Sequence, residues 1–183
     1  MKSIDITSVT KNYKNHVVHH EFIKVSKRVT IIKGQNGSGK STLCKAIMAL
    51  IKYTGQIKCS GSIAYFPEYL QLPLILKSKT FLELMIPITR HNIMKQLIHM
   101  LKMEQNLDKE IIELSKGMNC KLRLIYTLSL DKDIYLLDEP FSGLDIETTK
   151  TLKNYILQSN KMYIISTHLD VFTQSSSLEV INL

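Results

Sequence analysis

The sequence has 183 residues, of which 44% are hydrophobic and 22% charged. This composition excludes a disordered chain and predicts one globular domain with a sizeable core. The apolar stretches, such as 134–137, are too short to cross a bilayer, and the start of the chain alternates polar and apolar residues instead of forming a signal core. We therefore expect a cytosolic protein.

The formal net charge of +8 is compatible with nucleic acid, an anionic membrane surface or polyphosphate ligands. The lysines are scattered, with no dense block and no interleaved aromatic residues, which argues against nucleic acid as a partner. Cys44, Cys59 and Cys120 are odd in number and widely spaced, so we expect neither a disulfide nor a zinc site, but small buried side chains.

The first segment of the chain predicts an antiparallel β region. Residues 3–9 alternate as a half-buried strand, and further short strands are expected at 17–18 and 21–25, with Tyr13 in a polar turn between them. His16, His19 and His20 lie nearby, but Glu21 is the one cysteine or carboxylate residue at ligand spacing, so we do not predict a metal site there.

Residues 34–42 form a glycine-rich loop between the apolar run 29–32 and a predicted helix at 41–51. Gly34, Gly37 and Gly39 allow successive backbone N–H groups to converge on phosphate oxygens. Lys40 adds a positive charge, Ser41 offers a hydroxyl to Mg²⁺, and the start of the helix favours an anion. The loop predicts a nucleotide-binding site made of Gly34, Gln35, Asn36, Gly37, Ser38, Gly39, Lys40, Ser41 and Thr42.

After this helix, residues 55–58 and 62–66 are predicted to form a strand pair that ends before Pro67 and Glu68. From residue 79 to 116 apolar residues recur at helical spacing, which predicts amphipathic helices. Methionines in this segment are expected to fill the core rather than to line a specialised groove.

Four further motifs point to a family. Leu114-Ser115-Lys116-Gly117-Met118 opens a predicted helix, a buried strand ends in Asp138-Glu139-Pro140, and Ser142-Gly143-Leu144-Asp145 and Ser166-Thr167-His168 follow. In this order, from Tyr13 to His168, the chain resembles an ABC-type ATPase subunit. The resemblance implies an α/β fold of the P-loop NTPase class: a RecA-like core, an N-terminal antiparallel β region and a short α-helical subdomain at about 69–125, all within one ABC-type ATP-binding domain, 1–183.

The paired carboxylates support the resemblance independently. An apolar strand that ends in Asp138-Glu139 delivers both groups to the edge of a sheet beside the phosphate loop. Asp138 is expected to serve Mg²⁺ through coordinated water, and Glu139 to accept a proton from the attacking water. His168 follows a predicted strand and is expected to contact the γ-phosphate of ATP, with Lys40 as the third catalytic residue.

The resemblance assigns further roles. The signature motif, which contacts the ATP held by an opposite subunit, would be Ser115, Lys116, Gly117 and Met118. This contact implies a homodimer or heterodimer. The dimer-contact loop would be Ser142, Gly143, Leu144 and Asp145. A serine N-cap explains Ser115 alone but not Gly117 at the start of a helix. Tyr13 would stack on adenine. Glu68, a further predicted metal residue, stands where the family has a glutamine that links the nucleotide site to the helical subdomain. Met118 replaces the usual glutamine of the signature motif.

We therefore expect an ATP-hydrolysing subunit that powers a membrane transporter through dimer closure, with separate permease subunits, on the cytoplasmic face of the membrane. Loose similarity of layout favours export of a peptide or lipid-like molecule. An alternative is a soluble ABC-type ATPase that acts on nucleic acid or ribosomes, which the positive charge favours. A regulator that senses ATP without turnover is disfavoured by intact Lys40, Asp138, Glu139 and His168.

Overall fold

The computed structural model describes residues 2–172 and 178–183, which form two compact units. The first unit contains residues 1–68, 132–139 and 160–183, and the second contains residues 69–131 and 140–159. The predicted helical segment, about 69–125, falls in the second unit, which also contains the helix at 146–158. No helix in the described ranges is long and apolar enough to span a bilayer.

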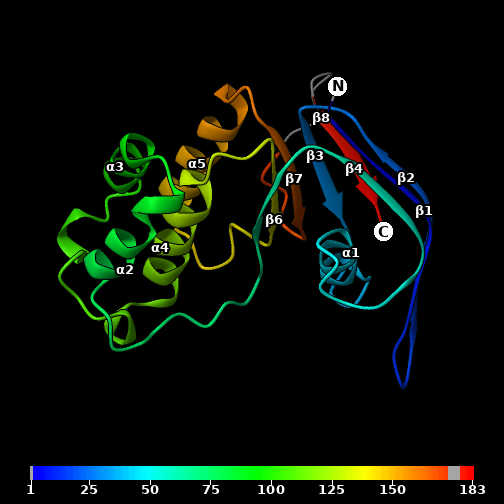
Figure 1. Cartoon of the computed structure of the whole chain (residues 1–183), viewed down its shortest axis with the longest axis horizontal. Coiled ribbons are helices and arrows are strands. Elements are labelled where there is room, and N and C mark those ends of the chain that lie inside the picture. Colours follow the sequence, from blue (N-terminus) through cyan, green and yellow to red (C-terminus); the bar gives the residue numbers. More distant parts are fainter. Residues whose placement is uncertain (1, 173–177) are drawn as a thin grey trace. The chain divides into compact units, whose positions relative to one another are not determined.

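In the described part of the chain, the first unit contains two sheets and one helix (Figure 1). A three-stranded antiparallel sheet has the order β2-β1-β4, and a five-stranded parallel sheet has the order β5-β6-β7-β3-β8. The elements are β1 (Ser3–Asn12), β2 (Val17–Val25), β3 (Val29–Lys33), α1 (Lys40–Ile47), β4 (Thr54–Ser60), β5 (Ile63–Phe66), β6 (Ile134–Asp138), β7 (Met162–Thr167) and β8 (Leu178–Asn182). The predicted α/β fold with an N-terminal antiparallel region is confirmed.

One core joins both sheets to α1. It contains Ile4 and Ile6 of β1, Leu43 of α1 and Ile164 of β7, all of them shielded from solvent. The inner strands β6 and β7 are buried along their whole length, as expected for parallel strands covered on both faces. Because this core packs α1 against the parallel sheet, the loop that precedes α1 is held at the carboxyl edge of the sheet.

The second unit is helical. It contains α2 (Ser78–Met85), α3 (His91–Met100), α4 (Lys116–Ser129), α5 (Ile146–Gln158) and short 3₁₀ turns at Ile86–Ile88, Glu104–Asn106 and Ile111–Glu113. Met94 and Met103 are buried in this unit, as predicted for methionines of the segment, whereas Met85 and Met100 are partly exposed.

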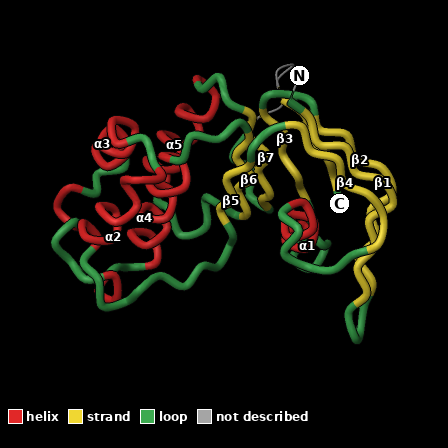
Figure 2. The backbone as a smooth tube through the Cα atoms, in the orientation of Figure 1, coloured by secondary structure: helices red, strands yellow, loops and turns green. Residues whose placement is uncertain are grey.

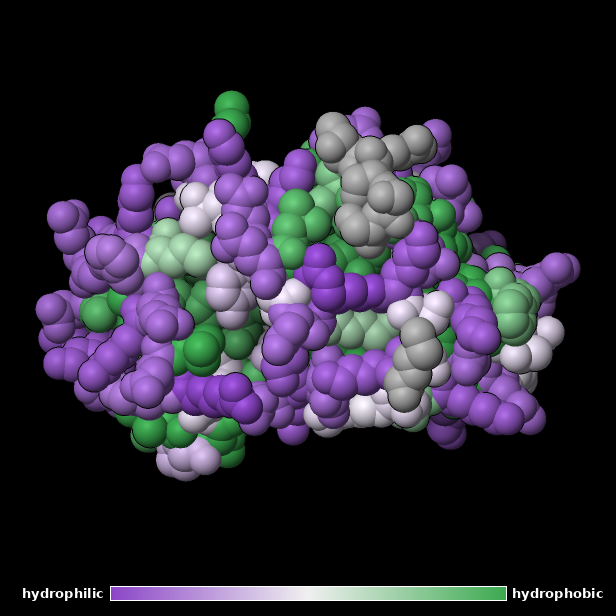
Figure 3. Space-filling model, turned by 90° about the horizontal axis from the view of Figure 1, so that it is seen from above, coloured by the Kyte–Doolittle hydropathy of each residue, from purple (hydrophilic) through white to green (hydrophobic). Residues whose placement is uncertain are grey.

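On the face of the molecule shown in Figure 3, hydrophilic residues predominate and apolar residues form patches between them.

Three sequence-based predictions about local structure are wrong. Residues 55–58 and 62–66 do not pair: β4 joins β1, whereas β5 joins β6 in the other sheet, because Gly61 turns the chain between them with φ 127°. The short strands expected at 17–18 and 21–25 are one strand, β2, since backbone pairing with β1 continues through the two histidines. Cys44 and Cys120 are buried as expected, but Cys59 is exposed on β4, at the edge of its sheet.

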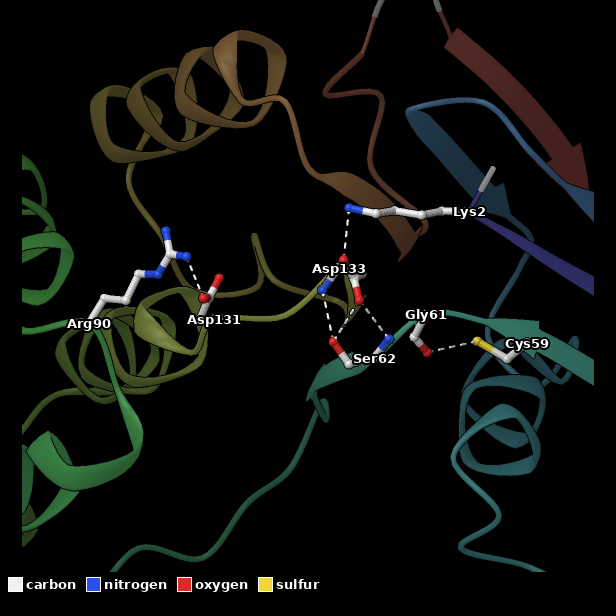
Figure 4. Close-up of polar contacts among 7 residues, drawn as sticks. All are labelled: Lys2, Cys59, Gly61, Ser62, Arg90, Asp131 and Asp133. Atoms are coloured by element: carbon white, nitrogen blue, oxygen red, sulfur yellow. Dashed lines mark hydrogen bonds and ion pairs between the residues drawn. The ribbon is translucent and has the colours of Figure 1, made fainter.

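A polar cluster joins the starts of β5 and β6 (Figure 4). The Asp133 carboxylate accepts hydrogen bonds from the Ser62 backbone N–H at 3.0 Å and the Ser62 hydroxyl at 2.9 Å, and it lies 2.9 Å from the Lys2 ammonium. These contacts, the Ser62 N–H first, hold the pKa of Asp133 well below its usual range. The cluster ties β5 to β6 and thereby supports the strand that carries the paired carboxylates.

Substitution of Asp133 by Asn should lower the stability of the fold, and the deficit should depend on pH. Because the pKa of Asp133 is lower in the folded than in the unfolded chain, its stabilisation is present above the unfolded pKa and is lost as pH falls through the folded pKa. The difference between wild type and Asp133→Asn in urea midpoint should therefore be largest near neutrality and shrink below about pH 4. Asp108→Asn is the control, since Asp108 is exposed; equal midpoints for the two variants would contradict the role of Asp133.

Candidate active site

The phosphate loop, residues 34–42, joins β3 to α1 as predicted. Gly37 and Gly39 have φ values of 87° and 97°, in the left-handed region that glycine adopts without strain. Within the described chain, α1 has no side-chain N-cap hydrogen bond and no acidic residue in its first turn. No N-cap side chain therefore accepts from the first N–H groups of α1, and no acidic side chain in the first turn offsets their partial positive charge. The loop therefore suits an anionic ligand.

Lys40 is buried at the start of α1, with 6% of its side chain exposed. Its ammonium donates to the backbone carbonyls of Gly34 at 2.8 Å and Gln35 at 3.1 Å and lies 3.8 Å from Oε1 of Glu139. The lysine charge thus lies between the loop and the second of the paired carboxylates.

Asp138 ends β6 directly opposite Ser166 of the neighbouring strand β7. The Ser166 hydroxyl donates to Oδ1 of Asp138, whereas Oδ2 is buried without a hydrogen-bond partner among the described residues. A buried carboxylate oxygen without a donor is costly, and a hard cation is the kind of group that satisfies it. Asp138 therefore fits the predicted Mg²⁺ site.

Glu139 follows the strand in a left-handed conformation, with φ 50°, and its backbone N–H donates to the Ser166 carbonyl at 3.0 Å. Its Oε1 lies 3.0 Å from Nδ1 of His168, and its Oε2 is buried without a partner in the described ranges. A positive φ in a non-glycine residue is uncommon and is found often at functional sites. The strained backbone turns the carboxylate toward His168 and Lys40.

The structure thus brings Lys40, Asp138, Glu139 and His168 together at the carboxyl edge of the parallel sheet, as the sequence predicted. His168 is 45% exposed, whereas Glu139 is 6% exposed, so the pair has a buried carboxylate and an accessible imidazole. Such a pair suits proton transfer with a ligand that approaches from solvent.

Tyr13 and Glu68, two further predicted site residues, also belong to the first unit. The Tyr13 hydroxyl lies 3.1 Å from Oγ1 of Thr42, so the turn after β1 reaches the end of the phosphate loop. Glu68 lies two residues beyond β5 and is exposed. Its assignment to the metal stays a prediction.

The structure adds two residues to which the sequence assigned no role. Ser166 holds Asp138, and only the register of β6 with β7 reveals it. His20 of β2 is buried with its Nε2 3.3 Å from the position that a Cβ on Gly39 would take. Burial, with a smaller contribution from His19, lowers the pKa of His20 below its ordinary value.

The predicted signature motif and dimer-contact loop lie in the second unit, and they contact each other. Ser115 caps α4 by accepting a hydrogen bond from the Met118 N–H at 3.3 Å. A Cβ on Gly117 would lie 2.6 Å from the Gly143 carbonyl oxygen. This backbone approach explains the glycine that N-capping alone does not explain.

Lys116 and Asp145 complete this contact. The side chain of Lys116 packs over Gly143, which has φ 82°. Asp145 caps α5 by accepting from the Thr148 N–H at 2.7 Å, which is the first cause of its lowered pKa, and it lies 3.7 Å from the Lys121 ammonium. The residues 115–118 and 142–145 therefore form one packed surface.

Comparison with known proteins places this site in a family. The family model described as ABC transporter matches residues 21–142. An ABC transporter ATP-binding protein of Methanocaldococcus jannaschii, itself uncharacterised, is 34% identical over 146 residues, 74% of this chain and 55% of that protein. The zinc import ATP-binding protein ZnuC of Rickettsia conorii is 29% identical over 180 residues, 93% of this chain and 77% of that protein.

A solved structure of an ATP-binding protein of Pyrococcus furiosus has the same fold, with a TM-score of 0.80 at 24% identity, covering 98% of this chain and 97% of that one. The chain belongs to the ABC transporter family and is an ABC-type ATPase domain of that family. It spans about half of the length of the first relative named above. The predicted family is thereby confirmed.

Substitution of Gly117 by Ala should destabilise the second unit. Alanine is favoured over glycine in a helix by about 1 kcal/mol, but its Cβ would meet the Gly143 carbonyl at 2.6 Å. The clash should cost about 1–3 kcal/mol and outweigh the gain. Urea unfolding measures the difference, with Asn119→Ala in the same turn of α4 as the control; a Gly117→Ala protein more stable than wild type would contradict the close approach.

Substitution of Ser166 by Ala should remove the hydroxyl that donates to Oδ1 of Asp138 and leave both carboxylate oxygens without a hydrogen bond from the described side chains. We expect a loss of about 1–3 kcal/mol in the free energy of unfolding, and recovery of part of it on addition of Mg²⁺. Ser60→Ala, at an exposed position of β4, is the control. Equal stability of the two variants would rule out the support of Asp138 by Ser166.

Proposed function

We propose that the chain hydrolyses ATP and powers a membrane transporter. The observation that carries the proposal is the buried Glu139 carboxylate, with one oxygen 3.0 Å from His168 and 3.8 Å from Lys40 and the other without a partner in the described part of the chain. An oriented carboxylate with an available oxygen, beside a phosphate loop, is the arrangement that a general base for water requires.

In the proposed reaction, Oε2 of Glu139 takes a proton from water while the water oxygen attacks the γ-phosphorus. The bond between that phosphorus and the bridging oxygen breaks, and ADP leaves with the electron pair. Lys40 exchanges its contacts with the Gly34 and Gln35 carbonyls for phosphate oxygens, and His168 contacts the γ-phosphate. Negative charge that spreads over these oxygens is stabilised by Lys40 and by the N–H groups at the start of α1.

Asp138 and Ser41 would hold Mg²⁺ in this site, with Asp138 acting through coordinated water. The ion would supply positive charge to the phosphates of ATP. The chain's own contribution is the fixed position of Asp138, which the Ser166 hydroxyl and the buried end of β6 provide.

The proposal includes a second ATPase subunit, identical or related. The packed surface of residues 115–118 and 142–145 presents a serine, backbone N–H groups and Lys116, all suited to an anion, and we propose that it completes the ATP site of the opposite subunit. ATP would close the dimer and hydrolysis would open it, and separate permease subunits would receive this movement at the cytoplasmic face of the membrane.

The direction of transport is a finer part of the proposal. The sequence favoured export of a peptide or lipid-like molecule, whereas the named relative ZnuC is an import protein. That name supports uptake over export, and we propose uptake by a transporter whose permease selects the solute. Assays of solute movement in vesicles that contain the complete complex test the direction.

Substitution of Glu139 by Gln should lower ATP turnover by about 10²–10⁴-fold, the usual contribution of a general base, and preserve ATP binding, because the side-chain shape is retained. Turnover is measured as phosphate release and binding by equilibrium titration. Because closure precedes hydrolysis in the proposed cycle, the variant should also accumulate as an ATP-dependent dimer in size-exclusion chromatography. Unchanged turnover would show that Glu139 is not the base.

The transporter assignment itself is tested by recovery of the chain from detergent-solubilised membranes of its native cell. The expected result is co-purification with an integral membrane protein. Recovery only with ribosomes or nucleic acid would instead support the soluble ATPase that the positive charge allowed.

A further inference from the structure

The turn between β1 and β2, which Figure 2 shows as a loop at the end of the hairpin, holds two stacked rings. The Tyr13 N–H donates to the His16 carbonyl at 2.9 Å, which closes the turn. The phenol ring of Tyr13 and the imidazole of His16 then stack with centroids 4.7 Å apart and planes inclined by 12°. His16 therefore covers one face of the Tyr13 ring.

The Tyr13 ring is also held at its outer end. Its hydroxyl lies 3.1 Å from Oγ1 of Thr42, in the first turn of α1. The ring is thus fixed by one contact across the turn and by one contact to the last residue of the phosphate loop. A ring held in this way is ordered before any ligand binds, which reduces the entropy cost of stacking a base on it.

The Lys11 ammonium lies 5.5 Å from the centroid of the same ring. A cation–π contact at this distance near the surface is weak, and lysine has a flexible stem. A purine offers a larger flat surface to the ring than one ammonium group does. A base can therefore displace Lys11, whereas the backbone of His16 is held by the hydrogen bond that closes the turn.

We propose that His16 is a positioning residue for the purine base of the nucleotide. It covers one face of Tyr13 and holds the ring in place, so that the base stacks on the other face. The inference rests on the proposed function, because it requires that the phosphate loop binds a nucleoside triphosphate. Tyr13 was already predicted to stack on adenine. The proposal adds a function for His16, to which the sequence assigned none.

The test compares two probes, MgATP and magnesium tripolyphosphate, which share the triphosphate but not the base. For His16→Ala we expect the affinity for MgATP to fall about five- to tenfold, at the lower end of the range expected for loss of base stacking, and the affinity for tripolyphosphate to stay unchanged. His16→Phe keeps a flat ring and should restore the affinity for MgATP. Asn15→Ala, in the same turn but outside the stack, is the matched control and should bind both probes as wild type does.

Each other outcome overturns the proposal. Equal weakening of both probes in His16→Ala would show that the residue only supports the phosphate loop, and unchanged MgATP affinity would show that the stack has no role in binding. Failure of His16→Phe to restore binding while its fold is intact by circular dichroism would exclude stacking as the mechanism. If the wild-type chain binds neither probe, the proposed nucleotide site itself fails, which is a result distinct from the others.

Discussion

The parallel pairing of β6 with β7 is the constraint on which the site depends. It places Asp138 opposite Ser166, so that a hydroxyl from one strand holds a carboxylate from the next, and it lets the Ser166 carbonyl accept from the Glu139 N–H at 3.0 Å. The strand ends there, and the left-handed backbone at Glu139 turns the second carboxylate toward His168, which follows β7. A shift of one residue in this register would turn the side chains of the strand to opposite faces and separate all of these groups.

The two units divide the chemistry between them. The first unit holds the phosphate loop, the paired carboxylates and His168, whereas the second holds the surface formed by residues 115–118 and 142–145. Gly117 and Gly143 allow the backbone of that surface to pack without a side chain between its two segments. The groups of the proposed hydrolysis thus lie in one unit and the surface proposed to meet a partner's nucleotide lies in the other, which suits the proposed dependence of activity on association.

The polar groups of the site are balanced by burial and pairing. Lys40 and Glu139 are each 6% exposed and lie 3.8 Å apart, so each charge lowers the cost of burying the other. The carboxylate oxygens that have no partner among the described residues, Oδ2 of Asp138 and Oε2 of Glu139, are those that the proposed chemistry uses. Buried polar atoms without a hydrogen-bond partner are expected at functional sites, where a ligand supplies the partner.

The sequence by itself determined the family and the α/β class and gave the candidate site residues, because a glycine-rich loop and an apolar strand that ends in two carboxylates carry their signals in local order. Only the tertiary structure decided which strands pair: β4 and β5 are neighbours in the chain but belong to different sheets. It also revealed Ser166 as the support of Asp138 and the Gly143 carbonyl as the reason for Gly117. These contacts join residues that are far apart in the chain. The spacing of residues along a sequence does not show which distant segments will pack against one another.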